Sequence, residues 1–235
     1  MECLIRLLKT RPIVLYPAFN DALITRARSR ALSDFLYKSD ADVMLMIDSD
    51  IAFLPEHALK ICDQAMTHDI VVGQYVTRNY EQALPTTFTN VGKKIVYGTD
   101  LDELVEVRYG ATGFMAIHRR VAQKLAKRRD MPLCHPTTYS FHPFFNTEAV
   151  KEETEWIFAS EDFFFCRKAR QEGFRVWLNP GVRLSHIGEH FFRLEDMLPL
   201  SRPAQPVPMS LQLNLIQNGG ISWDIQKAEP EPPRE

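Results

Sequence analysis

The sequence predicts an α/β fold, in which a sheet of mostly parallel strands is flanked by helices. Over the first 80 residues, short apolar runs alternate with longer segments whose apolar residues recur at helical spacing. The composition, 45% hydrophobic and 25% charged over 235 residues, is that of an ordinary globular protein. A chain of this length can bury one sizeable core, so we expect one main domain.

The first elements follow in strand and helix order. Residues 12–16 (PIVLY) form a short run rich in β-branched residues, which predicts a strand, and residues 21–38 carry a helical pattern. Residues 43–47 (VMLMI) are continuously apolar, as expected of a strand buried on both faces. A proline at position 55 suits the first turn of the next helix, and residues 70–76 predict another strand.

Beyond residue 76 the pattern changes to shorter pieces separated by glycine and aspartate, which predicts a small antiparallel addition. The expected strands there are residues 86–89, 94–97, 104–109 and 114–117. Helices are then expected over residues 119–129 and 161–172, with a loop over 131–146 between them and strands at 175–178 and 182–185.

The C-terminal part differs in composition from the rest. Seven of the 15 prolines lie between residue 199 and the end of the chain, and the closing AEPEPPRE has no apolar periodicity. Such a composition cannot bury a core. We therefore expect a domain over residues 1–198 and an extended or partly disordered extension over 199–235.

Charge and cysteine usage narrow the class of protein. The net charge of −2 offers no general attraction to nucleic acid or to anionic membranes. The four cysteines form no CxxC pair, which disfavours a zinc site or a disulfide framework and favours a reducing, cytoplasmic compartment. Arginine and lysine interrupt the apolar N-terminal segment, so we expect no membrane span.

The segment MLMIDSDIAF is the most informative part of the sequence. Alternation along an extended chain would place Asp48 and Asp50 on one face, with Ser49 facing away. Both carboxylates would follow a buried strand, where open α/β sheets bind their ligands. Two adjacent carboxylates repel each other unless a cation or proton lies between them, and this predicts a divalent metal. The alternative is that both aspartates are turn residues.

Five segments in this order resemble a GT-A nucleotide-sugar glycosyltransferase, similar to compact bacterial, phage and viral members. They are ITRARSRALSDFL, DADVMLMIDSDIAFLPEHAL, IVVGQYVTR, YGATGFMAIHRRV and SEDFFFCRKARQEGFRVWLNPGVRLSHIG. The resemblance covers most of the chain, from about residue 12 to residue 192. It implies a single Rossmann-like domain that transfers a sugar from a nucleotide diphosphate donor to a hydroxyl group of an acceptor.

The resemblance also implies a metal centre. Asp48 and Asp50 match the DxD pair that holds the metal, and His186 matches a histidine that is a further ligand. Imidazole beside carboxylates suits Mn²⁺ better than Mg²⁺, although either ion is compatible. Arg28 matches the arginine of the family's RN pair near the donor, but its neighbour here is Ser29 instead of asparagine. A solvent-exposed helix face is the alternative for Arg28.

The resemblance places the pair Glu161 and Asp162 beside the acceptor. There a carboxylate can take the proton of the attacking hydroxyl, and we expect Asp162 to do so, with Glu161 as the second candidate. The same residues also suit the start of a helix that follows Ser160, where acidic side chains meet the positive end of the helix dipole.

Four further residues are expected to contact the donor. Gln74 and Arg78 lie at the end of a central strand, where Arg78 could meet a phosphate. Ser49 lies between the two aspartates, and Gly113 allows close approach of the backbone. The resemblance implies that the segment of Gly113 borders the acceptor and the transferred sugar. These residues could equally be ordinary turn and edge positions.

Six basic residues form a local cluster at positions 119, 120, 124, 127, 128 and 129. Such a cluster is commonly a solvated helix face, and the other interpretation is an acceptor that carries phosphates, including DNA. A nucleic acid acceptor is therefore possible but not favoured over a carbohydrate. Two other functions compete with sugar transfer: a sugar-1-phosphate nucleotidyltransferase, and a non-catalytic nucleotide-sugar-binding protein with the same fold.

Overall fold

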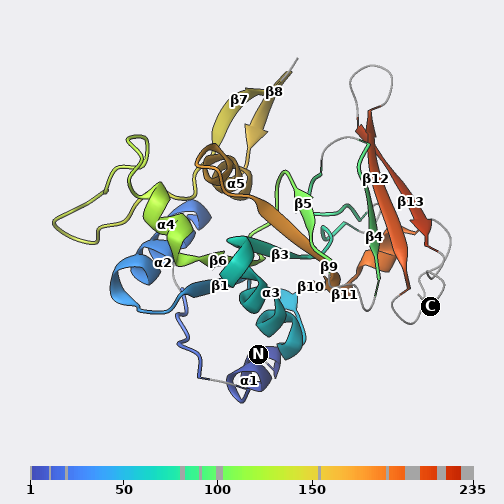
Figure 1. Cartoon of the computed structure of the whole chain (residues 1–235), viewed down its shortest axis with the longest axis horizontal. Helices are drawn as coiled ribbons and strands as arrows, with labels where there is room; N and C mark the ends of the chain where they lie inside the picture. Colours follow the sequence, from blue (N-terminus) through green and yellow to red (C-terminus); the bar gives the residue numbers. More distant parts are fainter. Residues whose placement is uncertain are drawn as a thin grey trace.

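A five-stranded sheet lies at the centre of the molecule (Figure 1). The computed structural model describes residues 2–10, 12–18, 21–79, 83–89, 92–98, 103–152, 155–188, 191–198, 207–215 and 221–228. The strand order is β1-β6-β3-β9-β5. The strands are β1 (Val43–Ile47), β3 (Ile70–Gln74), β5 (Val105–Val107), β6 (Phe114–His118) and β9 (Val176–Arg183).

The central sheet is mixed, which corrects the prediction of a mostly parallel sheet. Strands β3 and β9 are parallel neighbours, whereas β1–β6, β3–β6 and β5–β9 are antiparallel pairs. Strands β1 and β3 do run in the same direction, as the alternation of strand and helix predicts. However, β6 lies between them in the opposite direction, and the order of elements along the sequence does not reveal such an insertion.

The apolar run over residues 12–16 does not join this sheet. Residues 12–18 have no regular secondary structure, and Val14 is 87% exposed. The prediction of a first strand there is wrong for this structure, and β1 lies at the edge of the sheet.

Helices cover both faces of the sheet, so the pleat of β3 divides its side chains between two cores. Ile70 and Val72 belong to a core on the side of α2, α4 and α5, and Val71 belongs to one on the side of α1 and α3. The helices are α1 (Glu2–Leu8), α2 (Ile24–Lys38), α3 (Pro55–His68), α4 (Arg119–Leu125) and α5 (Glu161–Gln171). Four of them match predicted helices, and α1 was not expected. None of the described helices is long and apolar enough to cross a membrane.

Three small antiparallel sheets surround the centre. One has the order β11-β10-β2, one has the order β13-β12-β4, and β7 pairs with β8 as a hairpin beside α5 (Figure 1). Their bounds are β2 (Ile51–Ala52), β4 (Lys94–Tyr97), β7 (Glu148–Glu152), β8 (Glu155–Ala159), β10 (Ser185–Ile187), β11 (Phe191–Phe192), β12 (Met209–Leu215) and β13 (Ile221–Lys227). A short 3₁₀ helix, η1, spans Leu194–Met197.

The C-terminal extension is folded in part. Strand β12 pairs with β4, and Met209 and Leu211 are buried at 0% and 1% exposure. The expectation of an extended tail without a core therefore fails for residues 209–215 and 221–227. Their apolar residues alternate with polar ones, which is a strand pattern that the average composition of the proline-rich tail conceals. Residues 199–206, 216–220 and 229–235 lie outside the described residues.

Candidate functional site

The segment after β1 forms a turn. The amide of Ile51 donates to the carbonyl oxygen of Asp48 at 3.1 Å, and the amide of Asp48 donates to the carbonyl oxygen of Gly113 at 3.0 Å. The alternation of an extended chain therefore does not apply to residues 48–50. As a result, the side chains of Asp48 and Asp50 have different partners.

Arg28 of α2 joins two carboxylates from distant parts of the chain. Its Nη2 atom lies 2.9 and 2.8 Å from the two carboxylate oxygens of Asp48, and its Nη1 lies 2.5 Å from Oε1 of Glu161. The Arg28 side chain is only 11% exposed. This contact brings the end of β1 next to the beginning of α5, as the sequence predicts for the two acidic motifs.

The charge of Arg28 is stabilised by these partners. Burial alone would lower the pKa of the guanidinium, but the carboxylates of Asp48 and Glu161 outweigh burial and raise that pKa. Arg28 is therefore a permanent cation between two anions. The alternative of a solvent-exposed helix face does not describe it.

Asp50 lies next to the predicted histidine. Oδ2 of Asp50 is 3.3 Å from Nε2 of His186 and 3.2 Å from Nη1 of Arg78. Strand β10 carries His186 into place by pairing with β2, and the amide of Ile187 donates to the carbonyl oxygen of Asp50 at 2.7 Å. The three-stranded sheet thus brings Asp50 next to His186, which is 136 positions away in the sequence (186 − 50).

The hydrogen bonds of His186 fix its tautomer. Nδ1 lies 2.9 Å from the carbonyl oxygen of Val76. A carbonyl only accepts, so Nδ1 must carry the proton, and in the neutral ring Nε2 then presents a lone pair. That lone pair faces the carboxylate of Asp50. Two electron-rich atoms at 3.3 Å need a proton or a cation between them, and histidines that bind metals commonly donate their other N–H to a carbonyl.

The chemistry of Asp50 and His186 therefore fits a divalent cation with mixed oxygen and nitrogen ligands, such as Mn²⁺. Asp48 does not join them, because both of its oxygens contact Arg28. Among the described residues, no three His, Cys, Asp or Glu side chains converge as a metal-binding group. The predicted set of Asp48, Asp50 and His186 is thus brought together only as the pair Asp50 and His186.

The two candidate bases at the start of α5 have different surroundings. Glu161 is held by Arg28, whereas Oδ1 of Asp162 accepts from its neighbour Ser160 and, at 2.9 Å, from the amide of Phe163. Among the contacts of the described residues, none is made by Oδ2 of Asp162. Asp162 also lies close enough to Arg28 to contribute to its raised pKa. Asp162 therefore both accepts a hydrogen bond at the start of α5 and lies at the site.

Tyr75, which follows Gln74 directly after β3, also lies at the site. Its hydroxyl accepts a hydrogen bond from the amide of Gly113 at 3.1 Å, and its ring meets that of His186 edge-on at 5.3 Å. A Cβ atom at Gly113 would lie 2.4 Å from the Tyr75 hydroxyl and 3.1 Å from Oδ2 of Asp48. The need for glycine at position 113 is therefore real, and its reason is the tyrosine.

Burial raises the pKa of Tyr75, and the negative charge of Asp48 adds to this effect. The phenol is thus a neutral hydroxyl beside the carboxylates. The only available signal in the sequence was its position at the end of the buried strand β3.

One predicted donor contact is contradicted by the structure, and that of Ser49 stays a prediction. The Gln74 side chain is buried, accepts from the hydroxyl of Tyr97 at 3.3 Å and donates to the carbonyl oxygen of Tyr75. The pleat of β3 directs it towards β4, and this contradicts the prediction that Gln74 contacts the donor. Ser49 is exposed in the turn between the two aspartates. Arg78 remains available at the rim, with 49% of its side chain exposed.

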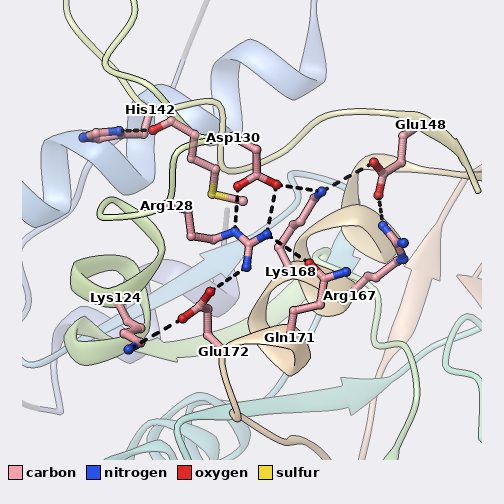
Figure 2. A network of polar contacts seen from close by, with 10 residues as sticks. Lys124, Arg128, Asp130, His142, Glu148, Arg167, Lys168, Gln171 and Glu172 are labelled. Carbon is pink, nitrogen blue, oxygen red and sulfur yellow. Dashed lines mark hydrogen bonds and ion pairs between the residues drawn. The ribbon is translucent and has the colours of Figure 1, made fainter.

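The basic cluster around α4 is largely committed to internal contacts. Figure 2 shows Arg128 between Asp130 and Glu172, at 2.8 and 2.6 Å, and Lys124 next to Glu172 at 3.6 Å. Arg120 pairs with Asp69, and the guanidinium of Arg119 donates to the carbonyl oxygens of residues 36, 39 and 41. Ion pairs and backbone contacts account for four of the six basic residues without a phosphate-bearing ligand.

Comparisons with known proteins add little. No protein-family model matches the chain, and no curated protein matches its sequence. Among solved structures, the chain is similar to the "Crystal Structure of A197 from STIV", with a TM-score of 0.46 and 14% identity over 92% of this chain and 82% of that chain. A likeness at this TM-score supports no conclusion about fold or function, which therefore depend on the geometry described above.

Proposed function

We propose that the chain is a metal-dependent glycosyltransferase of GT-A type, which moves a sugar from a nucleotide diphosphate donor to a hydroxyl group of an acceptor. One observation carries the proposal. The lone pair of His186 Nε2 faces the carboxylate of Asp50 at 3.3 Å, beside a second group of carboxylates on Arg28. The resemblance of the sequence motifs supports the same conclusion independently.

Asp50 and His186 are the residues that would hold the cation. A divalent ion bound there would act as a Lewis acid on the donor diphosphate. Arg78, which contacts Asp50 and is half-exposed, is placed to add positive charge at the rim. Asp48 keeps its ion pair with Arg28 and is not a ligand of the metal ion in this proposal. Within the pair, the charges of Asp48 and Arg28 neutralise each other close to the donor.

Asp162 is the proposed general base. Oδ1 is occupied by the start of α5, and this fixes the orientation of the carboxylate. Oδ2 can then accept the proton of an acceptor hydroxyl as its oxygen attacks the anomeric carbon. Glu161 is a weaker candidate because its ion pair with Arg28 occupies one of its oxygens. Positioning of donor and acceptor would supply most of the rate enhancement.

The proposal is tested by nucleotide binding and by donor hydrolysis. Calorimetry with UDP, GDP and dTDP, each with Mn²⁺, with Mg²⁺ and with EDTA, should show tight binding of at least one nucleotide that depends on the metal. The corresponding nucleotide sugar should then be hydrolysed slowly to the nucleoside diphosphate in the presence of the ion. Equal binding of every nucleotide with and without EDTA would contradict the proposal.

The same experiment separates the competing functions. A sugar-1-phosphate nucleotidyltransferase would release pyrophosphate from a nucleoside triphosphate and a sugar phosphate. A non-catalytic protein would bind the nucleotide sugar and leave it intact. Of these three functions, only that of a glycosyltransferase releases a nucleoside diphosphate from the nucleotide sugar.

A further inference from the structure

The phenol of Tyr75 carries a proton for which the described part of the chain offers no acceptor. Tyr75 is 6% exposed, and its hydroxyl oxygen accepts from the amide of Gly113 at 3.1 Å. A phenol can also donate one hydrogen bond, and none of the described residues accepts it. A buried donor without a partner costs free energy, so a ligand that supplies the acceptor would satisfy it.

The hydroxyl has a defined position because Tyr75 is held on several sides. Its carbonyl oxygen accepts from the amide and the hydroxyl of Thr86, at 3.2 and 2.9 Å, and from Nε2 of Gln74. Its ring packs edge-on against His186, with 5.3 Å between the ring centroids. A donor that is already fixed in place loses little conformational entropy when a ligand binds.

The hydroxyl of Tyr75 lies next to the carboxylate of Asp48. A Cβ atom on Gly113 would be 2.4 Å from the hydroxyl and 3.1 Å from Oδ2 of Asp48, so both oxygens border the same point at Gly113. Burial raises the pKa of the phenol, and the charges of Asp48 and Asp162 raise it further. The phenol therefore keeps its proton at neutral pH and is a neutral donor beside carboxylates that only accept.

These surroundings favour a hydroxyl group as the ligand of Tyr75. A hydroxyl can accept from the phenol and donate to a carboxylate at the same time. A phosphate oxygen only accepts, and it would find no donor in the carboxylates of Asp48 and Asp162. One neutral donor beside acceptors is thus complementary to the hydroxyl of a sugar.

The proposed function assigns this hydroxyl to the transferred sugar. The cation held by Asp50 and His186 would bind the diphosphate, and Asp162 would accept the proton of the acceptor. The transferred sugar must lie between these two points, because its anomeric carbon is bonded to the diphosphate and is attacked by the acceptor. Tyr75 has His186 against its ring and Asp162 within electrostatic reach, so its hydroxyl lies in this interval.

We infer that Tyr75 recognises the sugar of the nucleotide sugar by donating its O–H to one hydroxyl group of that sugar. The inference rests on the proposed function and adds a residue that determines which sugar is bound. A site built to hydrogen-bond a hydroxyl discriminates against an analogue that lacks it, because the buried phenol is then left without a partner.

The test compares the binding of a nucleotide sugar with that of its nucleoside diphosphate. Calorimetry with Mn²⁺ measures UDP-glucose, GDP-mannose and dTDP-glucose, and also UDP, GDP and dTDP. Tyr75→Phe removes the O–H and keeps the ring against His186. The control is Tyr97→Phe in β4, because Tyr97 is also buried and its hydroxyl donates to Gln74 at 3.3 Å. Thermal unfolding of each protein measures the effect of the lost hydroxyl on the fold.

We expect Tyr75→Phe to weaken binding of the nucleotide sugar at least about tenfold and binding of the nucleoside diphosphate less than about twofold. Tyr97→Phe should change neither affinity. Equal weakening of both ligands by Tyr75→Phe would show that the phenol only supports the fold around Gly113, and it would overturn the inference. Unchanged binding of the nucleotide sugar by Tyr75→Phe would also overturn it.

Deoxy analogues of the nucleotide sugar identify the hydroxyl that Tyr75 contacts. For one analogue, the unaltered protein should bind as weakly as Tyr75→Phe binds the parent compound, and Tyr75→Phe should cause no further loss. Additive losses for every analogue would contradict a direct contact. Gly113→Ala is a second variant, because its Cβ would displace the hydroxyl, and it should show the same selective loss.

The nucleoside diphosphates distinguish failure of this inference from failure of the proposed function. If the unaltered protein binds none of them, the proposed function is wrong and the inference fails with it. If it binds one of them with Mn²⁺ and binds the nucleotide sugar as tightly after Tyr75→Phe, only the role of Tyr75 is refuted.

Discussion

At the scale of single residues, Arg28 determines whether two acidic motifs can lie together. Asp48 and Glu161 come from different ends of the site, and each contacts a different nitrogen of one guanidinium. Without that cation, two half-buried carboxylates would face each other without a partner. The arginine is therefore as important for assembling the site as for binding a ligand.

Replacement of Arg28 by methionine should lower the free energy of unfolding by on the order of 2 kcal/mol, because it leaves partly buried carboxylates unpaired. The matched control is Arg26→Met on the same helix, whose partner Asp21 forms a more exposed ion pair. That substitution should have a smaller effect. Urea unfolding at pH 7 measures both.

A second substitution identifies the cause. Adding Glu161→Gln to Arg28→Met removes one of the unpaired charges, so the double variant should recover part of the lost stability. If Glu161→Gln brings no recovery in the Arg28→Met background, the loss arises from packing of the arginine stem instead of from charge.

The residues of the site should also separate binding from chemistry. Asp162→Asn should reduce sugar transfer by on the order of 10²–10⁴ and leave metal-dependent donor binding nearly unchanged, because asparagine keeps the capping oxygen but cannot accept the proton. Asp50→Ala should weaken both. Initial rates and calorimetry with the same donor measure the two effects.

His186→Ala should resemble Asp50→Ala if the imidazole is a metal ligand. A variant that only loses stability, while metal-dependent binding persists, would show that His186 serves the contact with Val76 and β10 alone. Near-normal transfer by Asp162→Asn would make Glu161 the better candidate for the base.

At the scale of elements, the sequence predicts what depends on local periodicity. Helices α2, α3, α4 and α5 and strands β1, β3, β4 and β6 lie within a few residues of their expected positions, because their apolar spacing is regular. The neighbours of each strand could not be predicted in this way. The insertion of β6 between β1 and β3 depends on contacts between distant residues, which carry no local signal.

The candidate site shows the same division. Short motifs identify Asp50, His186, Asp162 and Arg28, and the structure brings Asp50, His186 and Arg28 into contact with other site residues. Asp162 lies close enough to Arg28 to raise its pKa, and its own contacts are with Ser160 and Phe163. The separation of Asp48 from Asp50 agrees with the alternative that both are turn residues, because the turn after β1 is closed by the hydrogen bond from the amide of Ile51 to the carbonyl oxygen of Asp48. Gln74 was misplaced because its residue type gives no indication of which side of β3 it occupies.

At the scale of elements, truncation of the chain tests whether β12 and β13 stabilise the fold. Truncation after residue 198 should lower the melting temperature markedly, because it uncovers Ile95 and Tyr97 of β4, which are 3% and 1% exposed. Truncation after Lys227 is the control and should change the melting temperature little. An unchanged melting temperature in both proteins would show that the tail does not contribute to the core.

At the scale of the whole molecule, buried thiol and phenol groups should make the folded protein less stable at alkaline pH. Burial raises the pKa of the Cys166 thiol to about 12 from 9.0, and burial also raises the pKa values of Tyr75 and Tyr97 above 10.0. The unfolded chain therefore loses these protons at a lower pH than the native protein does. Through these three groups, the free energy of unfolding should not change below about pH 8, where the unfolded chain also keeps their protons, and it should fall as the pH rises from there towards 12.

Urea unfolding at pH 8, 9.5 and 10.5 measures this decline. Tyr97→Phe removes one contributing group, so its stability should fall less steeply over the same interval than that of the unaltered protein. Parallel curves for both proteins would exclude Tyr97 as a source of the alkaline decline.

The pairing of β4 with β12 also has a consequence for biosynthesis. A ribosome releases residues 94–97 long before residues 209–212, so the edge of β4 that pairs with β12 has no partner until roughly half the length of the chain has been translated in between. A nascent polypeptide in this interval presents an unpaired strand with apolar side chains, and such edges associate readily with other chains. Messenger RNAs that end before residue 209 should therefore yield products that require chaperones or are degraded, whereas a chain that includes β12 closes this edge itself.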